Sequence, residues 1–165
     1  MNIIFLDFDG VMDTACYDMY LVSAGLAECD EDGRPVFDLM CISELKRIVD
    51  TTKAYIVVTS DWKYTDGYDE LLEMWKDRNM PGFLIDTTPN ISSHRGDEIE
   101  QWLKECKIDC NYVIIDDLSA ENFNSSQIDK LVVVDPFCGL DELAADKAIE
   151  ILLRQIENRN AEFFV

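Results

Sequence analysis

Two aspartates separated by one residue, Asp7 and Asp9, follow an apolar stretch near the start of the chain. Carboxylates at the end of a buried strand are costly to desolvate unless a partner offsets their charge. In extended backbone, residues two apart project to the same side of the strand. Gly10, which follows directly, permits a sharp turn and a close approach of the backbone to a ligand. These residues indicate a site that binds a cation or a phosphate.

Polar residues of a similar kind end two later apolar stretches. Thr59 and Ser60 end "AYIVVTS", and Asp116 and Asp117 end "YVIIDD". If these acids converge on the first pair, three or four carboxylates share a small space and repel one another strongly. Mg²⁺ would offset this repulsion, because it is a hard cation that prefers oxygen ligands. The predicted metal ligands are Asp7, Asp9, Asp116 and Asp117.

The elements that would position these residues are short apolar runs that alternate with amphipathic stretches. Strands are predicted at residues 3–7, 54–59, 82–86, 112–116 and 131–135, and helices at residues 41–50, 67–78, 95–106 and 140–156. The near-continuous Val and Ile of the strands indicate burial on both faces. Their alternation with helices predicts an α/β fold with a doubly wound, mostly parallel, Rossmann-like sheet. In such a sheet ligands bind at the carboxyl ends of the strands, which is where the polar residues lie.

The length and composition fit one globular domain over residues 1–165. Asp and Glu outnumber Lys and Arg by 34 to 14, which gives a formal net charge of −20. This balance argues against tight nonspecific binding of nucleic acid, because such binding depends on basic residues. Neither a signal peptide nor a run of roughly 18 apolar residues is recognisable, so a cytoplasmic protein that does not enter a membrane is expected.

Six cysteines are scattered along the chain, mostly among core-like residues, which favours reduced thiols. Cys106 and Cys110 are spaced as the start of a metal site. With one His in the chain and no second cysteine pair, a zinc site is not expected there. The sequence leaves open whether these two cysteines ever pair.

Four segments resemble, in the right order, the motifs of the haloacid dehalogenase-like (HAD) phosphohydrolases: "DFDGV", "VVTS", Arg95 before a helix, and "IIDD". The likeness covers nearly the whole chain. The segments "IVVTSDWK", "RGDEIEQWL", "YVIIDD" and "GLDELAADKAIEIL" further resemble a small, nearly capless HAD group associated with RNA repair proteins. Lys63 stands where that group usually has Arg, which puts a bidentate grip on phosphate in question.

The resemblance implies a role for each matching catalytic residue. Asp7 would be the nucleophile that takes the phosphoryl group as an aspartyl-phosphate. Asp9 would protonate the leaving oxygen and then activate water. Thr59, or alternatively Ser60, would hydrogen-bond the phosphoryl oxygens, and Arg95 would neutralise their charge.

The resemblance also implies how metal and substrate would bind. Mg²⁺ would be bound by Asp117, with Asp116 nearby, together with Asp7 and the backbone carbonyl of Asp9. Further substrate contacts would come from Gly10, Ser60 and Lys63.

Each of these positions also has a purely structural interpretation. The first two aspartates could serve turn chemistry, and Thr59 and Ser60 could cap the following segment. Arg95 could be a surface residue in the first turn of a helix, although a positive charge there opposes the helix dipole. Trp62 could anchor a loop or the core, or it could be a platform on which a base stacks.

Residues 13–37 form an irregular stretch, interpreted as a flap or minimal cap, and the chain leaves no room for a separate cap domain. An open site suits large substrates such as nucleic-acid ends. We therefore predict a Mg²⁺-dependent phosphomonoester hydrolase, with a polynucleotide 3′-end as candidate substrate and a partner protein that could supply affinity. The alternatives are a small-molecule or nucleotide phosphatase, with residues 13–37 as its flap, and a noncatalytic module that binds Mg²⁺ or phosphate.

Overall fold

The computed structural model describes residues 1–162 and contains a five-stranded sheet. Its strands are β1 (Asn2–Leu6), β2 (Tyr55–Val58), β3 (Leu84–Thr87), β4 (Asn111–Asp116) and β5 (Leu131–Val133). All neighbouring strands pair in parallel, in the order β3-β2-β1-β4-β5. The predicted α/β fold with a parallel, Rossmann-like sheet is confirmed.

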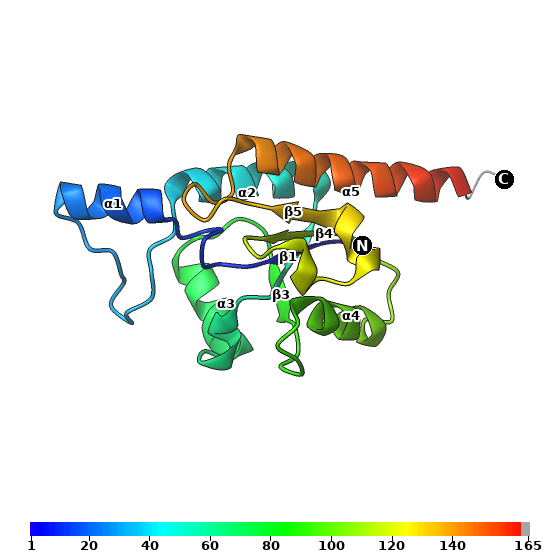
Figure 1. Cartoon of the computed structure of the whole chain (residues 1–165), viewed down its shortest axis with the longest axis horizontal. Coiled ribbons are helices and arrows are strands. Elements are labelled where there is room, and N and C mark those ends of the chain that lie inside the picture. Colours follow the sequence, from blue (N-terminus) through cyan, green and yellow to red (C-terminus); the bar gives the residue numbers. More distant parts are fainter. Residues whose placement is uncertain (163–165) are drawn as a thin grey trace.

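Helices cover both faces of this sheet (Figure 1). They are α1 (Ala15–Ala24), α2 (Leu39–Thr52), α3 (Tyr68–Asp77), α4 (Arg95–Glu105) and α5 (Glu142–Glu162). Short 3₁₀ helices span Asp61–Tyr64, Ala120–Asn122 and Ser125–Lys130. Buried residues of α2, α3 and α5 pack on one face, whereas α4 packs on the other.

The central strand β1 shows why the strands read as continuous apolar runs. Ile4 and Leu6 belong to the core that α2, α3 and α5 complete, and Ile3 and Phe5 belong to the core beneath α4. All four side chains are fully buried. Because both faces are covered, neither set of alternate residues needs to be polar.

The topological switch point of the sheet lies between β1 and β4, and the site lies at this point. Strands β2 and β3 lie on one side of β1, whereas β4 and β5 lie on the other. Beyond the last paired residues, the Asp7 amide donates to Ile115 O (3.1 Å) and the Thr59 amide to Leu6 O (2.9 Å). Residues that follow β1, β2 and β4 are thereby held side by side at the carboxyl edge, the usual ligand site of such sheets.

The stretch 13–37 is not wholly irregular, because it contains α1. The side chain of Thr14 caps the helix by accepting from the Tyr17 amide (3.1 Å), and Gly25 ends it with a left-handed φ of 68°. Leu21 is the buried residue of the helix, while Met19 is 65% exposed. Without a buried face the helix has no apolar periodicity, so the pattern that reveals other helices is missing.

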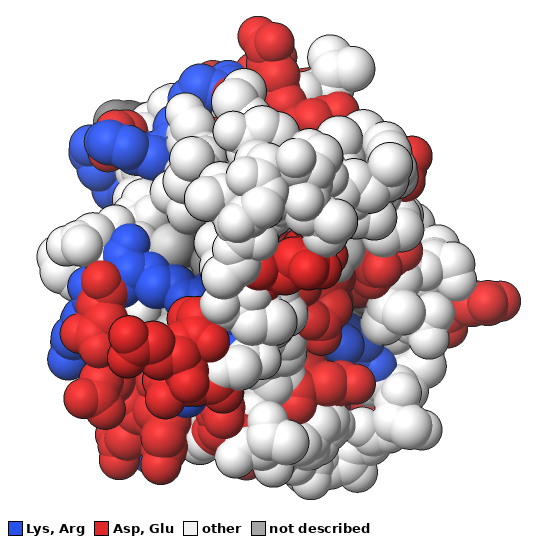
Figure 2. All heavy atoms as spheres, turned by 90° about the vertical axis from the view of Figure 1, so that its left-hand side faces the viewer, with Lys and Arg blue, Asp and Glu red and all other residues white. Residues whose placement is uncertain are grey.

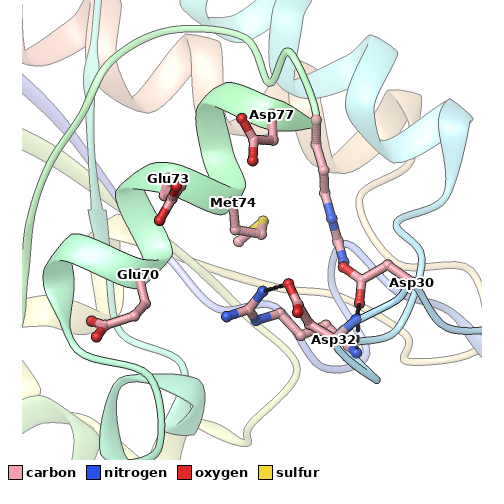
Figure 3. Close-up of a pocket in the computed structure, with 8 residues that line it drawn as sticks. Asp30, Asp32, Glu70, Glu73, Met74 and Asp77 are labelled. Atoms are coloured by element: carbon pink, nitrogen blue, oxygen red, sulfur yellow. Dashed lines mark hydrogen bonds and ion pairs between the residues drawn. The ribbon is translucent and has the colours of Figure 1, made fainter.

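The loop after α1, residues 26–37, is fastened to α3 and to the turn before it. Asp30 pairs with Arg78 at the end of α3, and Arg34 pairs with Asp66 (2.8 Å). The Arg78 guanidinium also lies 4.7 Å from the centre of the Phe37 ring. A hollow of about 340 Å³ lies between this loop and α3. Figure 3 shows acidic residues on both sides of it. None of the predicted site residues lines this hollow.

Candidate active site

Three carboxylates meet where β1 and β4 end. Asp7, Asp116 and Asp117 each offer an oxygen within 4.8 Å of the others. Asp7 and Asp116 are buried, and Asp117 is partly buried. The sheet explains this meeting, because Leu6 and Ile115 are paired in register and the residues that follow them are neighbours. Three of the four predicted metal ligands are therefore together through their side chains.

A single guanidinium lies against two of these acids. Arg95 Nη1 is 3.2 Å from Asp7 Oδ1 and 3.4 Å from Asp116 Oδ2, and it donates to the carbonyl of Thr59 (2.7 Å). Arg95 Nη2 reaches the exposed Asp61 at 3.4 Å. The arginine is the first residue of α4 and is only 9% exposed, so it is not a surface residue of a first helical turn.

The charges in this cluster are not balanced by Arg95. Burial raises the pKa of Asp7, and burial together with repulsion from Asp7 raises the pKa of Asp116 to about 7. Burial also raises the pKa of Asp117, and Arg95 only partly opposes these shifts. A second positive charge beside these carboxylates would oppose the shifts, because it favours their ionised forms.

A divalent cation fits this donor set. Asp116 Oδ1 accepts from the Leu118 amide (3.0 Å), but its buried Oδ2 accepts no hydrogen bond. Buried acceptors without a donor are rare and call for an explanation such as an ion. All the available donors are hard carboxylate oxygens, which suits Mg²⁺ better than a softer metal. The residues could therefore hold Mg²⁺.

Asp9 lies outside the group of three carboxylates. Its side chain is exposed, and its Oδ1 accepts a hydrogen bond from Trp62 Nε1 (2.8 Å). Gly10 follows with a left-handed φ of 70°, and an added Cβ would stand 2.7 Å from Asp117 Oδ2. The Gly10 amide donates to Asp13 Oδ1 (3.1 Å). The sharp turn expected at Gly10 is confirmed, although its amide serves the turn itself.

The two hydroxyls that end β2 have different surroundings. Both Thr59 and Ser60 are fully buried. Ser60 Oγ accepts from the Trp62 amide (3.3 Å) and caps the 3₁₀ helix that follows. Thr59 Oγ1 has no hydrogen-bond partner. The capping interpretation therefore fits Ser60, while the hydroxyl of Thr59 is left free for a ligand.

The side chain of Lys63 is directed into the protein. Its side chain is 2% exposed, and its ammonium donates to Thr59 O (3.1 Å), Thr88 Oγ1 (2.9 Å) and Glu98. An ammonium has three donors, and all are used within the protein. Burial lowers the pKa of Lys63, although pairing with Glu98 opposes the shift. In this position Lys63 supports the backbone beneath Thr59, and its contact with substrate stays a prediction.

Some residues around the site carry little signal in the sequence. Glu98 is the buried partner of Lys63, and it also accepts from Tyr64 (3.2 Å). One indication that Glu98 belongs to the site was present in the sequence: it follows Arg95 by three residues and so lies on the same face of α4.

Asp13 is half-buried, and burial and the charge of Asp9 raise its pKa to about 7. A hollow of about 420 Å³ lies beside Arg95, and Arg95 is one of the residues that line it.

A family model described as "HAD domain in Swiss Army Knife RNA repair proteins" matches residues 3–145. The chain belongs to this family. The predicted resemblance is thereby confirmed, and membership indicates a phosphatase-type hydrolase of the HAD superfamily. Searches of the curated proteins and of the solved structures found no match.

Two features of the whole surface bear on partners of this HAD domain. Among the described residues, no helix has both the length and the apolar character required to cross a membrane. Figure 2 looks onto the side that carries α1, and there acidic side chains far outnumber basic ones and gather in one dense group. On that face there is no continuous basic surface of the kind that binds nucleic acid without sequence preference.

Proposed function

We propose that this HAD domain is a Mg²⁺-dependent phosphomonoester hydrolase that works through an aspartyl-phosphate at Asp7. The observation that carries the proposal is the group of Asp7, Asp116 and Asp117, with Arg95 against it and a buried oxygen on Asp116 that accepts no hydrogen bond. Phosphoryl transfer gathers negative charge on three equatorial oxygens, and a cation with a guanidinium and a hydroxyl offsets that charge.

The chain's own residues have distinct roles in this reaction. A carboxylate oxygen of Asp7 attacks phosphorus, and the bond to the leaving oxygen breaks. Asp9 gives its proton to that oxygen, so an alcohol departs and an aspartyl-phosphate remains. Asp9 then takes a proton from water as the water oxygen attacks phosphorus, which releases inorganic phosphate and restores Asp7. Arg95 and the hydroxyl of Thr59 bind the phosphoryl oxygens throughout.

Mg²⁺ would be held by the carboxylates of Asp7, Asp116 and Asp117 and by the backbone carbonyl of Asp9. When bound, it supplies positive charge that lowers the repulsion between Asp7 and the incoming phosphate. Asp116 and Asp117 have no other part in the reaction. Their role is to fix the cation beside the nucleophile.

A phosphorylated nucleic-acid 3′-end is the substrate that we favour. The family to which the chain belongs is described as HAD domains in RNA repair proteins. The insertion after β1 is limited to α1 and the loop 26–37, so it does not amount to a separate cap domain. Because of the net charge of −20, we infer that a partner protein or domain supplies affinity for the nucleic acid. The six free thiols fit a cytoplasmic location.

The test is phosphate release from a mixed panel in Mg²⁺. The panel contains an aryl phosphate, free nucleotides, and oligonucleotides phosphorylated at the 3′ or the 5′ end. We expect release that disappears in EDTA and in Asp7→Asn, and that is fastest on 3′-ends. Asp69→Asn, at an exposed position of α3, is the matched control and keeps full activity.

Other results would redirect the proposal. Faster turnover of free nucleotides than of oligonucleotide ends would make this a small-molecule phosphatase, with α1 and its loop as a flap. A folded protein that binds Mg²⁺ but releases phosphate from nothing on the panel would be a binding module. Acid-stable labelling of Asp7 by a phosphoryl donor would exclude that module.

A further inference from the structure

The indole of Trp62 holds the carboxylate that the proposed function makes the proton donor. Trp62 Nε1 donates to Asp9 Oδ1 at 2.8 Å. Asp9 is exposed, and an exposed aspartate side chain otherwise samples several rotamers. One fixed hydrogen bond to Oδ1 orients the group and leaves Oδ2 to carry the proton. The inference that follows rests on the proposed function.

The indole itself has little freedom. Its ring lies against Phe8, with centroids 5.3 Å apart and planes at 77°, and against Phe37, with centroids 5.7 Å apart and planes at 33°. Both phenylalanines are buried. The Trp62 amide is fixed by Ser60 Oγ at 3.3 Å. Because the ring already packs on two aromatic neighbours, an anchor is a better description of Trp62 than a platform for a base.

The loop 26–37 completes this support. Phe37 ends the loop, and its ring is covered by the Arg78 guanidinium at 4.7 Å. Arg78 is in turn paired with Asp30, so the loop is joined to the end of α3 (Figure 3). A chain of contacts therefore runs from α3 through Phe37 and Trp62 to Asp9. Through these contacts the insertion after β1 supports the position of the Asp9 carboxylate.

We propose that Trp62 is a positioning residue for Asp9 and that its N–H group, rather than its bulk, is what the reaction requires. Proton transfer to the leaving oxygen depends on a carboxyl group held within hydrogen-bond reach. The requirement varies with the leaving group. An alkoxide is a poor leaving group and needs the proton, whereas a nitrophenolate departs readily without one.

Two changes at position 62 test this requirement. Trp62→Phe removes the N–H group and part of the ring, and benzothienylalanine installed at the same position replaces N–H by sulfur with the bicyclic shape kept. The second variant guards against a loss of folding in the first. Trp102→Phe is the matched control, because Trp102 Nε1 donates to Asp86 Oδ2 (2.7 Å), another exposed aspartate, on the α4 face of the sheet.

The readout is the single-turnover rate of alcohol release from an alkyl phosphate and from nitrophenyl phosphate. We expect both Trp62 variants to slow the alkyl phosphate by about tenfold or more and nitrophenyl phosphate by less than about threefold. Trp102→Phe should change neither rate. In an Asp9→Ala background, replacing Trp62 should have no further effect on the alkyl rate, because the two residues act as one unit.

Three outcomes would overturn the inference alone: wild-type rates in both Trp62 variants, equal losses on the two substrates, or additive losses with Asp9→Ala. Equal losses would assign Trp62 a purely structural role. Failure of the wild-type protein to turn over either phosphate would instead remove the proposed function, and the role of Trp62 would fall with it. The wild-type measurement therefore separates the two failures.

Discussion

At the scale of single residues, the neighbouring hydroxyls of Thr59 and Ser60 offer a direct comparison. Thr59→Val keeps the branched shape and removes an unpartnered, fully buried hydroxyl. We expect it to lower kcat/KM by roughly 10- to 100-fold, the value of a hydrogen bond to a charged group. The same change should leave the free energy of unfolding unchanged or raise it, because no internal hydrogen bond is lost.

Ser60→Ala should give the opposite pattern. It removes the acceptor that caps residues 61–64, so the free energy of unfolding should fall by about 1 kcal/mol. Its effect on kcat/KM should be smaller than that of Thr59→Val. Denaturant titration and steady-state kinetics on the two variants decide the matter. A larger loss of activity in Ser60→Ala would assign the phosphate contact to Ser60 instead.

The surroundings of some site residues can be predicted from the sequence, whereas those of others cannot. Asp7 and Asp116 could be expected to meet, because each ends an apolar strand and parallel strands align their carboxyl ends. Lys63 could not be placed in this way. Its partners Thr88 and Glu98 are 25 and 35 residues away, and only the folded chain brings them to its ammonium. The burial of a lysine at a site that resembles an arginine motif therefore could not be predicted from the sequence.

At the scale of elements, the start of α4 determines where Arg95 points. A Cβ on Gly96 would stand 2.6 Å from the Asn124 amide nitrogen and 2.8 Å from Phe123 Cα. The Gly96 carbonyl also accepts from Gln127 Nε2 (2.9 Å). The helix is thus pressed against the segment between β4 and β5. There is no space for a side chain, because two of the three nearest atoms are backbone atoms that cannot turn aside and the third is Gln127 Oε1 at 2.7 Å.

Gly96→Ala should therefore destabilise the protein although alanine favours helix. We expect a loss of about 2–3 kcal/mol from overpacking, larger than the gain of about 1 kcal/mol in helix propensity. Gly67→Ala is the control, since its Cβ would meet only the mobile end of Glu70. That variant should stay within about 1 kcal/mol of wild type in urea unfolding. Similar losses in both variants would contradict the close packing of α4.

Helices with one buried face could be predicted from the spacing of their apolar residues. The pattern of α2, with Leu45 and Ile48 buried, indicates a helix by its spacing alone. Helix α1 lacks such a pattern, because Leu21 is its buried residue and exposed apolar side chains surround it. Its caps, Thr14 and Gly25, were the remaining signal, and these residue types also occur in turns.

At the scale of the whole molecule, the acidic residues lie in two environments, one exposed to solvent and one inside the fold. Most of the 34 acidic residues can stay solvated, and salt screens their repulsion. A few are buried or half-buried, and for these the composition says nothing, because burial depends on the fold. Asp116 and Asp13 belong to this group, and burial raises the pKa of each to about 7. The stability of the protein should therefore depend on pH and on Mg²⁺ in a linked way.

Without metal, the free energy of unfolding should fall as the pH rises from 5 to 8. The ordinary pKa of an aspartate, 3.8, applies to the unfolded chain, whereas Asp116 and Asp13 have a pKa of about 7 in the folded protein. The folded state thus holds protons that the unfolded state has released. The stabilisation that they provide is complete below about pH 4 and is lost as the pH passes through about 7. Unfolding in EDTA at about 0.15 M salt measures this slope.

Mg²⁺ should restore stability mainly at the alkaline end. Protons and the cation compete for the same carboxylates, so the rise in melting temperature on adding Mg²⁺ should be larger at pH 8 than at pH 5. Asp116→Asn should remove most of this rise, because it takes away a predicted ligand. Asp13→Asn should keep the rise, since Asp13 accepts from the Gly10 amide and lies outside the three-carboxylate group. It should also reduce the dependence of stability on pH in EDTA, because it removes a carboxyl group with a raised pKa. An equal effect of Mg²⁺ at both pH values, or a full effect in Asp116→Asn, would show that the cation binds elsewhere.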